Sequence, residues 1–180
     1  MKNTRKLILA ALFLALGYVL PFFTGQVPAV GKMLLPMHIP VLLCGFVCGW
    51  QYGLIVGIIL PLFRSAVFGM PAMYPNAVAM AFELATYGFV SGFLYSHSRW
   101  QCVRALYRCL IIAMIAGRIV WGIAEVVLLG IGNGGFTVAA FITGAFAEAF
   151  PGIILQLIVI PVIMVSLNRA KLVHFKKDKK

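Results

Sequence analysis

Acidic side chains are scarce in this sequence of 180 residues, which contains only four of them. Charged residues of both signs make up 11% of the chain, whereas about a quarter of an ordinary soluble domain is charged. The composition is instead 63% hydrophobic, with a mean hydropathy of +1.03. These values exclude an ordinary soluble domain and predict one integral membrane domain over residues 1–180, with no room for a separate soluble one.

Cysteine is also scarce, and motifs for metal binding or nucleotide hydrolysis are absent from the sequence. Cys44 and Cys48 share one helical face, while Cys102 and Cys109 fall near a predicted connection. Neither pair has the companions of a zinc site and no disulfide framework is implied, so we interpret all four as small packing residues. No Walker motif, G-x-x-x-x-G-K-[ST], occurs. We therefore expect no metal, no cofactor and no ATP hydrolysis in this chain.

Basic residues are more plentiful and unevenly placed, which gives a formal net charge of +11. Twelve of the fifteen lie in three segments, namely Lys2, Arg5 and Lys6; Arg99, Arg104 and Arg108; and Arg169, Lys171, Lys176, Lys177, Lys179 and Lys180. The positive-inside rule places such segments in the cytoplasm. Because the charges flank apolar runs, we predict that they orient the chain in a lipid bilayer and that nucleic acid is not a partner.

Six apolar runs are candidates for membrane helices, each of which needs about 20 residues. They are 7–23, 37–50, 52–68, 77–95, 109–131 and 139–167. The first follows basic residues as a signal peptide does, but no small-residue cleavage site follows cleanly, so we interpret it as a retained helix. The expected fold is an all-α integral membrane bundle of six transmembrane helices, with the N- and C-termini cytoplasmic and the three basic segments on one side.

The second run is short, and the tight "GWQYG" turn that follows it leaves two interpretations open. The second and third runs could form one re-entrant hairpin. Alternatively, Gly45, Gly49, Gly53 and Gly57 allow two separate helices to pack closely, because small residues at four-residue spacing are a common device for close helix approach.

Five ionisable residues fall within the predicted spans, each at a cost of about 2.5–3.5 kcal/mol at a helix centre. They are Arg64, Glu83, Arg118, Glu125 and Glu148. Most lie towards the outer ends of their spans, so we expect Glu83 to face a polar cavity on the extracellular side and to meet Arg64 or the ligand there. The alternative is structural pairing, of Arg64 with a glutamate and of Arg118 with Glu125.

Helical periodicity groups these residues into polar stripes. The stripes are Arg118, Trp121 and Glu125; Asn76, Glu83 and Tyr87; and Glu148 with Gln156. Such stripes on three helices suit a pocket for a small polar ring compound. His38 starts the second run, where a plain helix-start role is the alternative to a role in binding. The candidate substrate-binding residues are Arg64, Glu83, Trp121, Glu125, Glu148, Tyr87, Asn76 and His38.

Several stretches together carry a family resemblance. They are Ala11-Leu12-Phe13-Leu14-Ala15, "LPMHIPVLLCGFVCGWQYGLIVGIILPLFRSAVFGMP" and "AMAFELATYGFVSGFLY". In these the chain resembles the substrate-binding (S) component of an energy-coupling factor (ECF) vitamin transporter, over nearly its whole length. The combination of "HIP", the glycine-rich hairpin and "FELATYG" is more specific than the alanine spacing alone.

The resemblance implies a protein of the bacterial plasma membrane that binds a vitamin or related micronutrient from outside with high affinity. It implies a transmembrane coupling subunit and two cytoplasmic ATPases as partners, with Ala11 and Ala15 in contact with the coupling subunit. The family's pocket region, transferred as a region, contains Arg64, Glu83, Trp121, Glu125 and Glu148. The vitamin stays open among compounds such as pyridoxine, a thiamin precursor, riboflavin and pantothenate.

Other classes of function remain as alternatives. A self-sufficient carrier is disfavoured because such carriers usually contain paired repeats, which the sequence lacks. A small intramembrane enzyme with Glu83 or His38 as acid–base is disfavoured because no His/Asp/Ser constellation, metal-ligand spacing or nucleophile elbow occurs. A purely structural assembly subunit is the third alternative.

Overall fold

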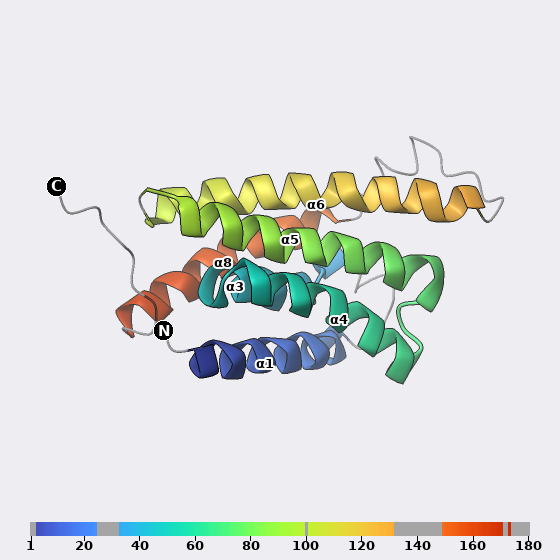
Figure 1. Cartoon of the computed structure of the whole chain (residues 1–180), viewed down its shortest axis with the longest axis horizontal. Coiled ribbons are helices and arrows are strands. Elements are labelled where there is room, and N and C mark those ends of the chain that lie inside the picture. The colour runs from blue at the N-terminus through green and yellow to red at the C-terminus, as the bar shows by residue number, and fades with distance from the viewer. Residues whose placement is uncertain (1–2, 25–32, 100, 132–148, 171–172, 174–180) are drawn as a thin grey trace.

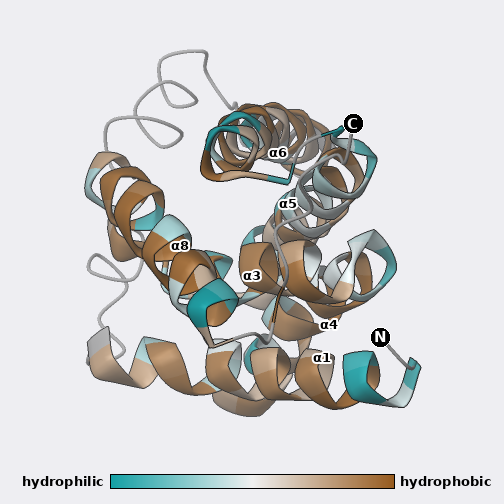
Figure 2. Cartoon of the chain, turned by 90° about the vertical axis from the view of Figure 1, so that its left-hand side faces the viewer, coloured by the Kyte–Doolittle hydropathy of each residue, from teal (hydrophilic) through white to brown (hydrophobic). Residues whose placement is uncertain are grey.

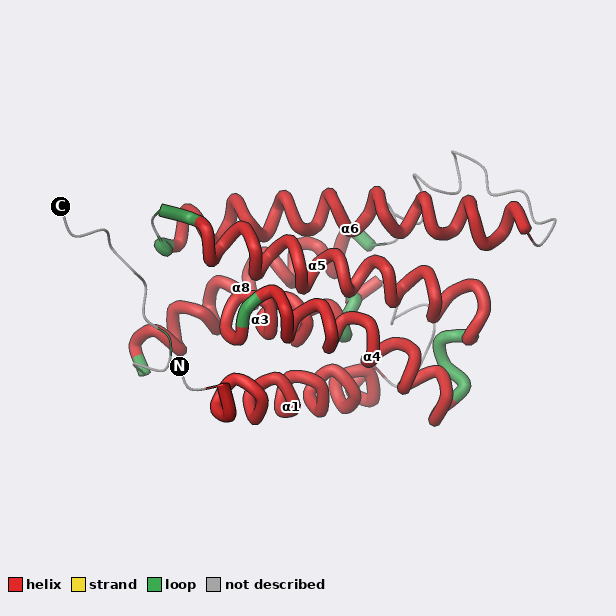
Figure 3. The backbone as a smooth tube through the Cα atoms, viewed as in Figure 1, coloured by secondary structure: helices red, strands yellow, loops and turns green. Residues whose placement is uncertain are grey.

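The chain folds into a bundle of helices, seen in a computed structural model that describes residues 3–24, 33–99, 101–131, 149–170 and 173 (Figure 1). Its elements are α1 (Asn3–Val19), the 3-10 helix η1 (Leu20–Thr24), α3 (His38–Cys48), α4 (Trp50–Phe68), the π-helix η2 (Met73–Ala77), α5 (Val78–His97), α6 (Val103–Ile131) and α8 (Phe150–Arg169). Figure 3 shows no strand in these parts of the chain, so the predicted all-α class is confirmed for them.

Five stretches of helix within the described residues are long and apolar enough to cross a membrane. They cover Asn3–Phe23, Trp50–Phe68, Met73–His97, Val103–Leu129 and Phe150–Arg169. Five of the six predicted runs therefore coincide with a candidate membrane helix. Residues 139–148 of the last run lie outside the described residues.

The second predicted run, 37–50, is the exception, because its helix is short. Helix α3 has 11 residues, which at 1.5 Å per residue is about 16 Å and roughly half of a bilayer's ~30 Å hydrocarbon core. The buried residues before it are not helical, and Leu35 has a φ of 50°. Pro36 explains the interruption, since proline has no N–H and disfavours the right-handed helical conformation in the residue before it.

The basic segments gather at one end of the bundle. Figure 1 shows that α1 begins, α5 connects to α6, and α8 ends at this same end. The described cations of these segments are Arg5 and Lys6 of α1, Arg99 before α6, Arg104 and Arg108 in the first turns of α6, and Arg169 of α8. Figure 2 looks at this end and shows hydrophilic segments capping largely hydrophobic helices.

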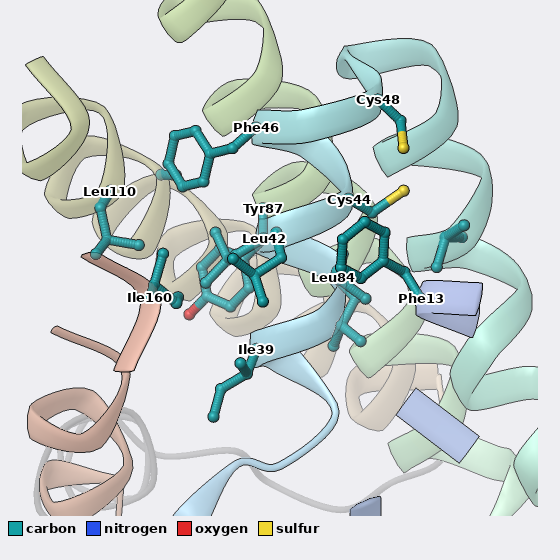
Figure 4. Close-up of a cluster of buried hydrophobic side chains, with 14 of the residues drawn as sticks. Phe13, Ile39, Leu42, Cys44, Phe46, Cys48, Leu84, Tyr87, Leu110 and Ile160 are labelled. Atoms are coloured by element: carbon teal, nitrogen blue, oxygen red, sulfur yellow. The ribbon is translucent and has the colours of Figure 1, made fainter. Parts of the chain in front are cut away.

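Helix α3 lies at the centre of the bundle. Ten of its residues are buried, and it contacts α1, α4, α5 and α8. Figure 4 shows part of the core around it, with Leu42 of α3, Leu84 and Tyr87 of α5, Leu110 of α6 and Ile160 of α8. Lipid is as apolar as these side chains, so close packing rather than exclusion of water holds such helices together.

Glycines allow α3, α4 and α5 to approach one another closely. A Cβ atom added to Gly53 would lie 2.7 Å from the carbonyl oxygen of Gly88 and 2.8 Å from the Cα of Gly45. One added to Gly92 would lie 2.7 Å from the carbonyl oxygen of Gly45. The prediction that Gly45 and Gly53 let two helices pack closely is confirmed, and α5 joins them through its own glycines. Gly49, with a φ of 104°, makes the turn from α3 to α4.

Helix α1 has one buried face and one exposed face. Ala10, Phe13 and Gly17 are buried against the bundle. Ala11 and Ala15, one turn apart, are exposed. The small side chains that the family resemblance assigns to a partner contact therefore lie on the outer face of the bundle.

Candidate functional site

Glu83 lies at the centre of a buried group of polar side chains. Its Oε1 atom is 3.0 Å from Nη1 of Arg118 and 3.5 Å from Nε2 of His38, and it accepts a hydrogen bond of 3.1 Å from the hydroxyl of Tyr87. Glu83 is 1% exposed and Arg118 is 5% exposed. We call His38, Glu83, Tyr87 and Arg118 the Glu83 cluster. It joins three helices, α3, α5 and α6.

The electrostatics of the Glu83 cluster depend on how well its charges are paired. The contact between Arg118 and Glu83 has the length of a hydrogen bond between two charged groups. Taking each charge out of water costs several kcal/mol, which the pair offsets only when further hydrogen bonds satisfy it. Tyr87 donates one such bond. The 3.5 Å contact from His38 is longer than a well-formed hydrogen bond, so we treat it as an electrostatic contact.

Local geometry brings Tyr87 into the cluster. Glu83 and Tyr87 are four residues apart on α5, so their side chains lie on one face and meet. Helix α6 makes room for the tyrosine at Gly117, where an added Cβ atom would overlap the ring of Tyr87. The ring of His38 lies on another side of Tyr87, with 5.2 Å between the ring centroids. A larger residue at position 117 would therefore push Tyr87 away from Glu83.

The position at which α3 begins brings His38 into the cluster. His38 is the first residue of the helix, and its backbone N–H donates to the carbonyl oxygen of Leu35 at 3.1 Å. Because α3 begins in the interior of the bundle, its first residue reaches Glu83. A helix N-terminus carries a partial positive charge, which favours a neighbouring carboxylate.

Arg118 and His38 also have buried nitrogen atoms that lack a hydrogen-bond partner among the described residues. These are Nε and Nη2 of Arg118 and both ring nitrogens of His38. Buried polar atoms in native proteins are nearly always hydrogen-bonded, and an unpaired one costs about 1–3 kcal/mol. The Glu83 cluster therefore has unused capacity to bind hydrogen-bonding groups.

Gln156 of α8 also has buried polar atoms that lack a hydrogen-bond partner among the described residues. It is fully buried, and neither atom of its side-chain amide has a partner within the described ranges. Gln156 lies between Gly152 and Ile160 on the buried stripe of α8. Helix α8 contacts α3 and α6, the helices that carry His38 and Arg118. Gln156 is thus buried on a helix that packs against the two helices carrying His38 and Arg118.

Arg64 lies elsewhere, so the expected meeting of Glu83 with Arg64 is wrong. The Nη1 atom of Arg64 donates to the carbonyl oxygen of Tyr18 at 3.1 Å. Its guanidinium lies 5.4 Å from the ring centroid of Phe22 and 5.5 Å from that of Phe68. Tyr18 is in the last turn of α1, where carbonyl oxygens lack helical partners and cations are favoured. Arg64 therefore caps α1.

The other predicted binding residues have different positions. Trp121 is half-buried and Glu125 is buried, and both follow Arg118 on α6. Asn76 is exposed in η2. Glu148 lies outside the described residues. Of the predicted binding set, the structure brings His38, Glu83 and Tyr87 together.

The predicted binding set omitted Arg118 and Gln156. Arg118 had been recognised as a buried charge, with Glu125 as its alternative partner. The sequence contained a better signal, because Glu83 and Arg118 lie almost equally far from the connection near residue 100. Residues at equal distances from the turn of a helical hairpin lie at the same depth, so these two were natural partners.

The described residues offer no metal site. They contain no group of three or more His, Cys, Asp or Glu side chains that could hold a metal ion. What the Glu83 cluster can do is pair charges and donate hydrogen bonds.

One comparison with known proteins identifies a family. The family model for the substrate-specific component of ECF transporters matches residues 5–164. No curated protein and no solved structure gives a match.

Proposed function

Because the chain belongs to the family of substrate-specific components of ECF transporters, we propose that it binds a vitamin or related micronutrient with high affinity for uptake. Components of this family are membrane transport subunits and not enzymes. We assign the energy for uptake to two cytoplasmic ATPases, which act through a transmembrane coupling subunit.

The observation that carries this proposal is the Glu83 cluster. Ionisable residues inside a membrane protein are expensive, and they usually mark a binding site or a path for substrate. This cluster connects three helices through Glu83 and retains buried nitrogen atoms, on Arg118 and His38, without partners among the described residues. A polar ligand would satisfy these atoms.

We assign ligand contact to the Glu83 cluster and to Gln156. Trp121 and Glu125 lie about one and two helical turns beyond Arg118 on α6, and we assign them to the rim of the site. Asn76 and Glu148 remain candidates for the same rim. Arg64 supports α1 in this scheme and does not touch the ligand, because its guanidinium is engaged by Tyr18, Phe22 and Phe68.

For the topology we propose six membrane segments in a bacterial plasma membrane, with both termini in the cytoplasm. The short α3 and the chain before it form the second segment. Three basic segments at one end of the bundle support this orientation. The Glu83 cluster then belongs to a site that is reached from the outside.

For the partner contact we propose the exposed face of α1 around Ala11 and Ala15. Both side chains are exposed while Phe13 on the opposite face is buried. Alanines one turn apart let another membrane helix approach closely. The coupling subunit is the partner that the family membership supplies for this face.

The first test is to identify the small molecule that co-purifies with the protein from gently solubilised membranes, by mass spectrometry. We expect a stoichiometric micronutrient whose binding is weakened at least about tenfold in Arg118→Gln, the loss of one hydrogen bond from a charged group. Arg108→Gln is the matched control, since Arg108 is exposed on the same helix. A protein that carries only lipid and binds none of a panel of vitamins would refute the proposal.

A further inference from the structure

We propose that the ligand carries a carboxylate, which binds to the Nε–Nη2 edge of Arg118, with the amide of Gln156 as a second donor. This inference rests on the proposed function, because it specifies the class of ligand that the same site accepts. It gives Arg118 and Gln156, both already assigned to ligand contact, the role of recognising an acid group.

The first argument comes from the shape of the guanidinium group. Arg118 uses Nη1 for its 3.0 Å contact with Glu83. Nε and Nη2 lie together on the other side of the planar group, and both are buried without a hydrogen-bond partner among the described residues. Two parallel N–H groups form the edge that a carboxylate accepts in a bidentate manner. The free edge of Arg118 therefore has the geometry for a planar acid.

The second argument comes from charge. In the Glu83 cluster, the carboxylate of Glu83 is balanced by Arg118, and His38 lies 3.5 Å from the same oxygen as a further group able to carry positive charge. A ligand with one negative charge adds a single charge to a cluster in which Glu83 and Arg118 already balance each other. A phosphate dianion would bring a second negative charge that needs another cation. Arg64 does not supply it, because it caps α1 beside Tyr18.

The third argument comes from Gln156. A buried side-chain amide has two N–H donors and one carbonyl acceptor, and here neither Nε2 nor Oε1 has a partner in the described part of the chain. Gln156 is one of the buried residues of α8, and α8 contacts α3 and α6. Its Nε2 donates to a carboxylate oxygen, and its Oε1 accepts from a neighbouring N–H or O–H of the ligand. Gln156 thus selects ligands with a hydrogen-bonding group next to the acid.

The test uses pairs of compounds that differ in the acid group alone. Pantothenate and its alcohol panthenol are one pair, nicotinate and nicotinamide a second, and biotin and biotinamide a third. Binding to the full-length protein in detergent is measured by isothermal titration calorimetry, together with the compound that co-purifies. We expect at least one acid to bind, and to bind roughly tenfold to a hundredfold more tightly than its neutral partner.

Variants assign the preference to residues. The double variant Glu83→Gln/Arg118→Gln removes both charges together and avoids a lone buried charge, and we expect it to bind acid and neutral compounds alike. Gln156→Leu should weaken binding of the acid about tenfold. Arg108→Gln and Ser166→Ala are the controls, because Arg108 is exposed on α6 and Ser166 donates to the carbonyl oxygen of Val162 on its own helix. Both should bind as the unaltered protein does.

The outcomes separate this inference from the proposed function. If no compound binds and none co-purifies, the proposed function fails and the inference fails with it. If a ligand binds but an acid has no advantage over its neutral partner, only the inference fails, and the acceptor for Arg118 belongs to the protein itself. If the double variant keeps the full preference for the acid, Arg118 is not its source.

Discussion

Replacing Arg118 with glutamine leaves the carboxylate of Glu83 buried without the cation that lies 3.0 Å from it. Breaking a buried ion pair by removing one partner typically costs about 3–5 kcal/mol, because an uncompensated charge remains. We therefore expect Arg118→Gln and Glu83→Gln each to lower the free energy of unfolding by about that amount. Replacing both charges by neutral groups of similar shape leaves no lone charge and should cost less than the sum.

The magnitude of interest is the coupling energy between the two positions. Residues in direct contact couple by about 0.5–3 kcal/mol. The short contact and the near-complete burial of both side chains place this pair at the upper end, so we expect at least about 2 kcal/mol. The four proteins of the cycle are compared by unfolding in mixed micelles, followed by circular dichroism.

Two matched variants control for general damage to the helices. Arg108→Gln removes an exposed arginine from α6, and Thr86→Val removes an exposed hydroxyl of α5 that donates to the carbonyl oxygen of Phe82. Both should stay within about 0.5 kcal/mol of the unaltered protein. Additive effects of Arg118→Gln and Glu83→Gln would show that the pair makes no specific contribution, and the reasoning about the Glu83 cluster would be wrong.

Two further predictions concern the α1 side of the bundle. Arg64→Gln removes the hydrogen bond to Tyr18 and the contacts with two aromatic rings. It should therefore lower the free energy of unfolding by about 2–4 kcal/mol, while ligand affinity stays within about twofold. A large loss of affinity would show that Arg64 belongs to the binding site. Ala15→Trp should abolish uptake in cells that contain the whole transporter, because a bulky side chain blocks the close approach of a partner helix. Ligand binding by the purified protein should be unchanged. Normal uptake would contradict the assigned contact.

The sequence was sufficient to predict most of the fold, because hydropathy and charge report directly on membrane segments. The runs 52–68, 77–95 and 109–131 each coincide with a candidate membrane helix. The second run, 37–50, was predicted to be short, and α3 covers His38–Cys48. Its start after Pro36 is consistent with the missing N–H of proline. Hydropathy did not indicate that the non-helical residues just before α3 are buried.

The candidate site was predicted only in part, because helical periodicity relates residues of one helix and not residues of two. It correctly joined Glu83 to Tyr87, which are one turn apart. Depth along the spans led to the expectation that Glu83 meets Arg64 or the ligand, whereas Arg64 donates to a carbonyl oxygen at the end of α1. Such a partner is invisible to patterns of side chains, since every residue has a carbonyl group. The pairing of Arg118 with Glu83 could have been predicted by comparing the depths of the two residues on either side of the α5–α6 connection.

The packing of α3, α4 and α5 explains how a costly polar group keeps its geometry. Inside lipid, helices gain little from burying apolar surface, so their association depends on close contact. The glycines Gly45, Gly53 and Gly88 bring three backbones close together. Because α5 carries Glu83 and Tyr87 and α3 carries His38, this contact fixes their relative positions on rigid elements, as a binding site requires. Arg118, on α6, can then be placed by its pairing with Glu83, which leaves its other edge for a ligand.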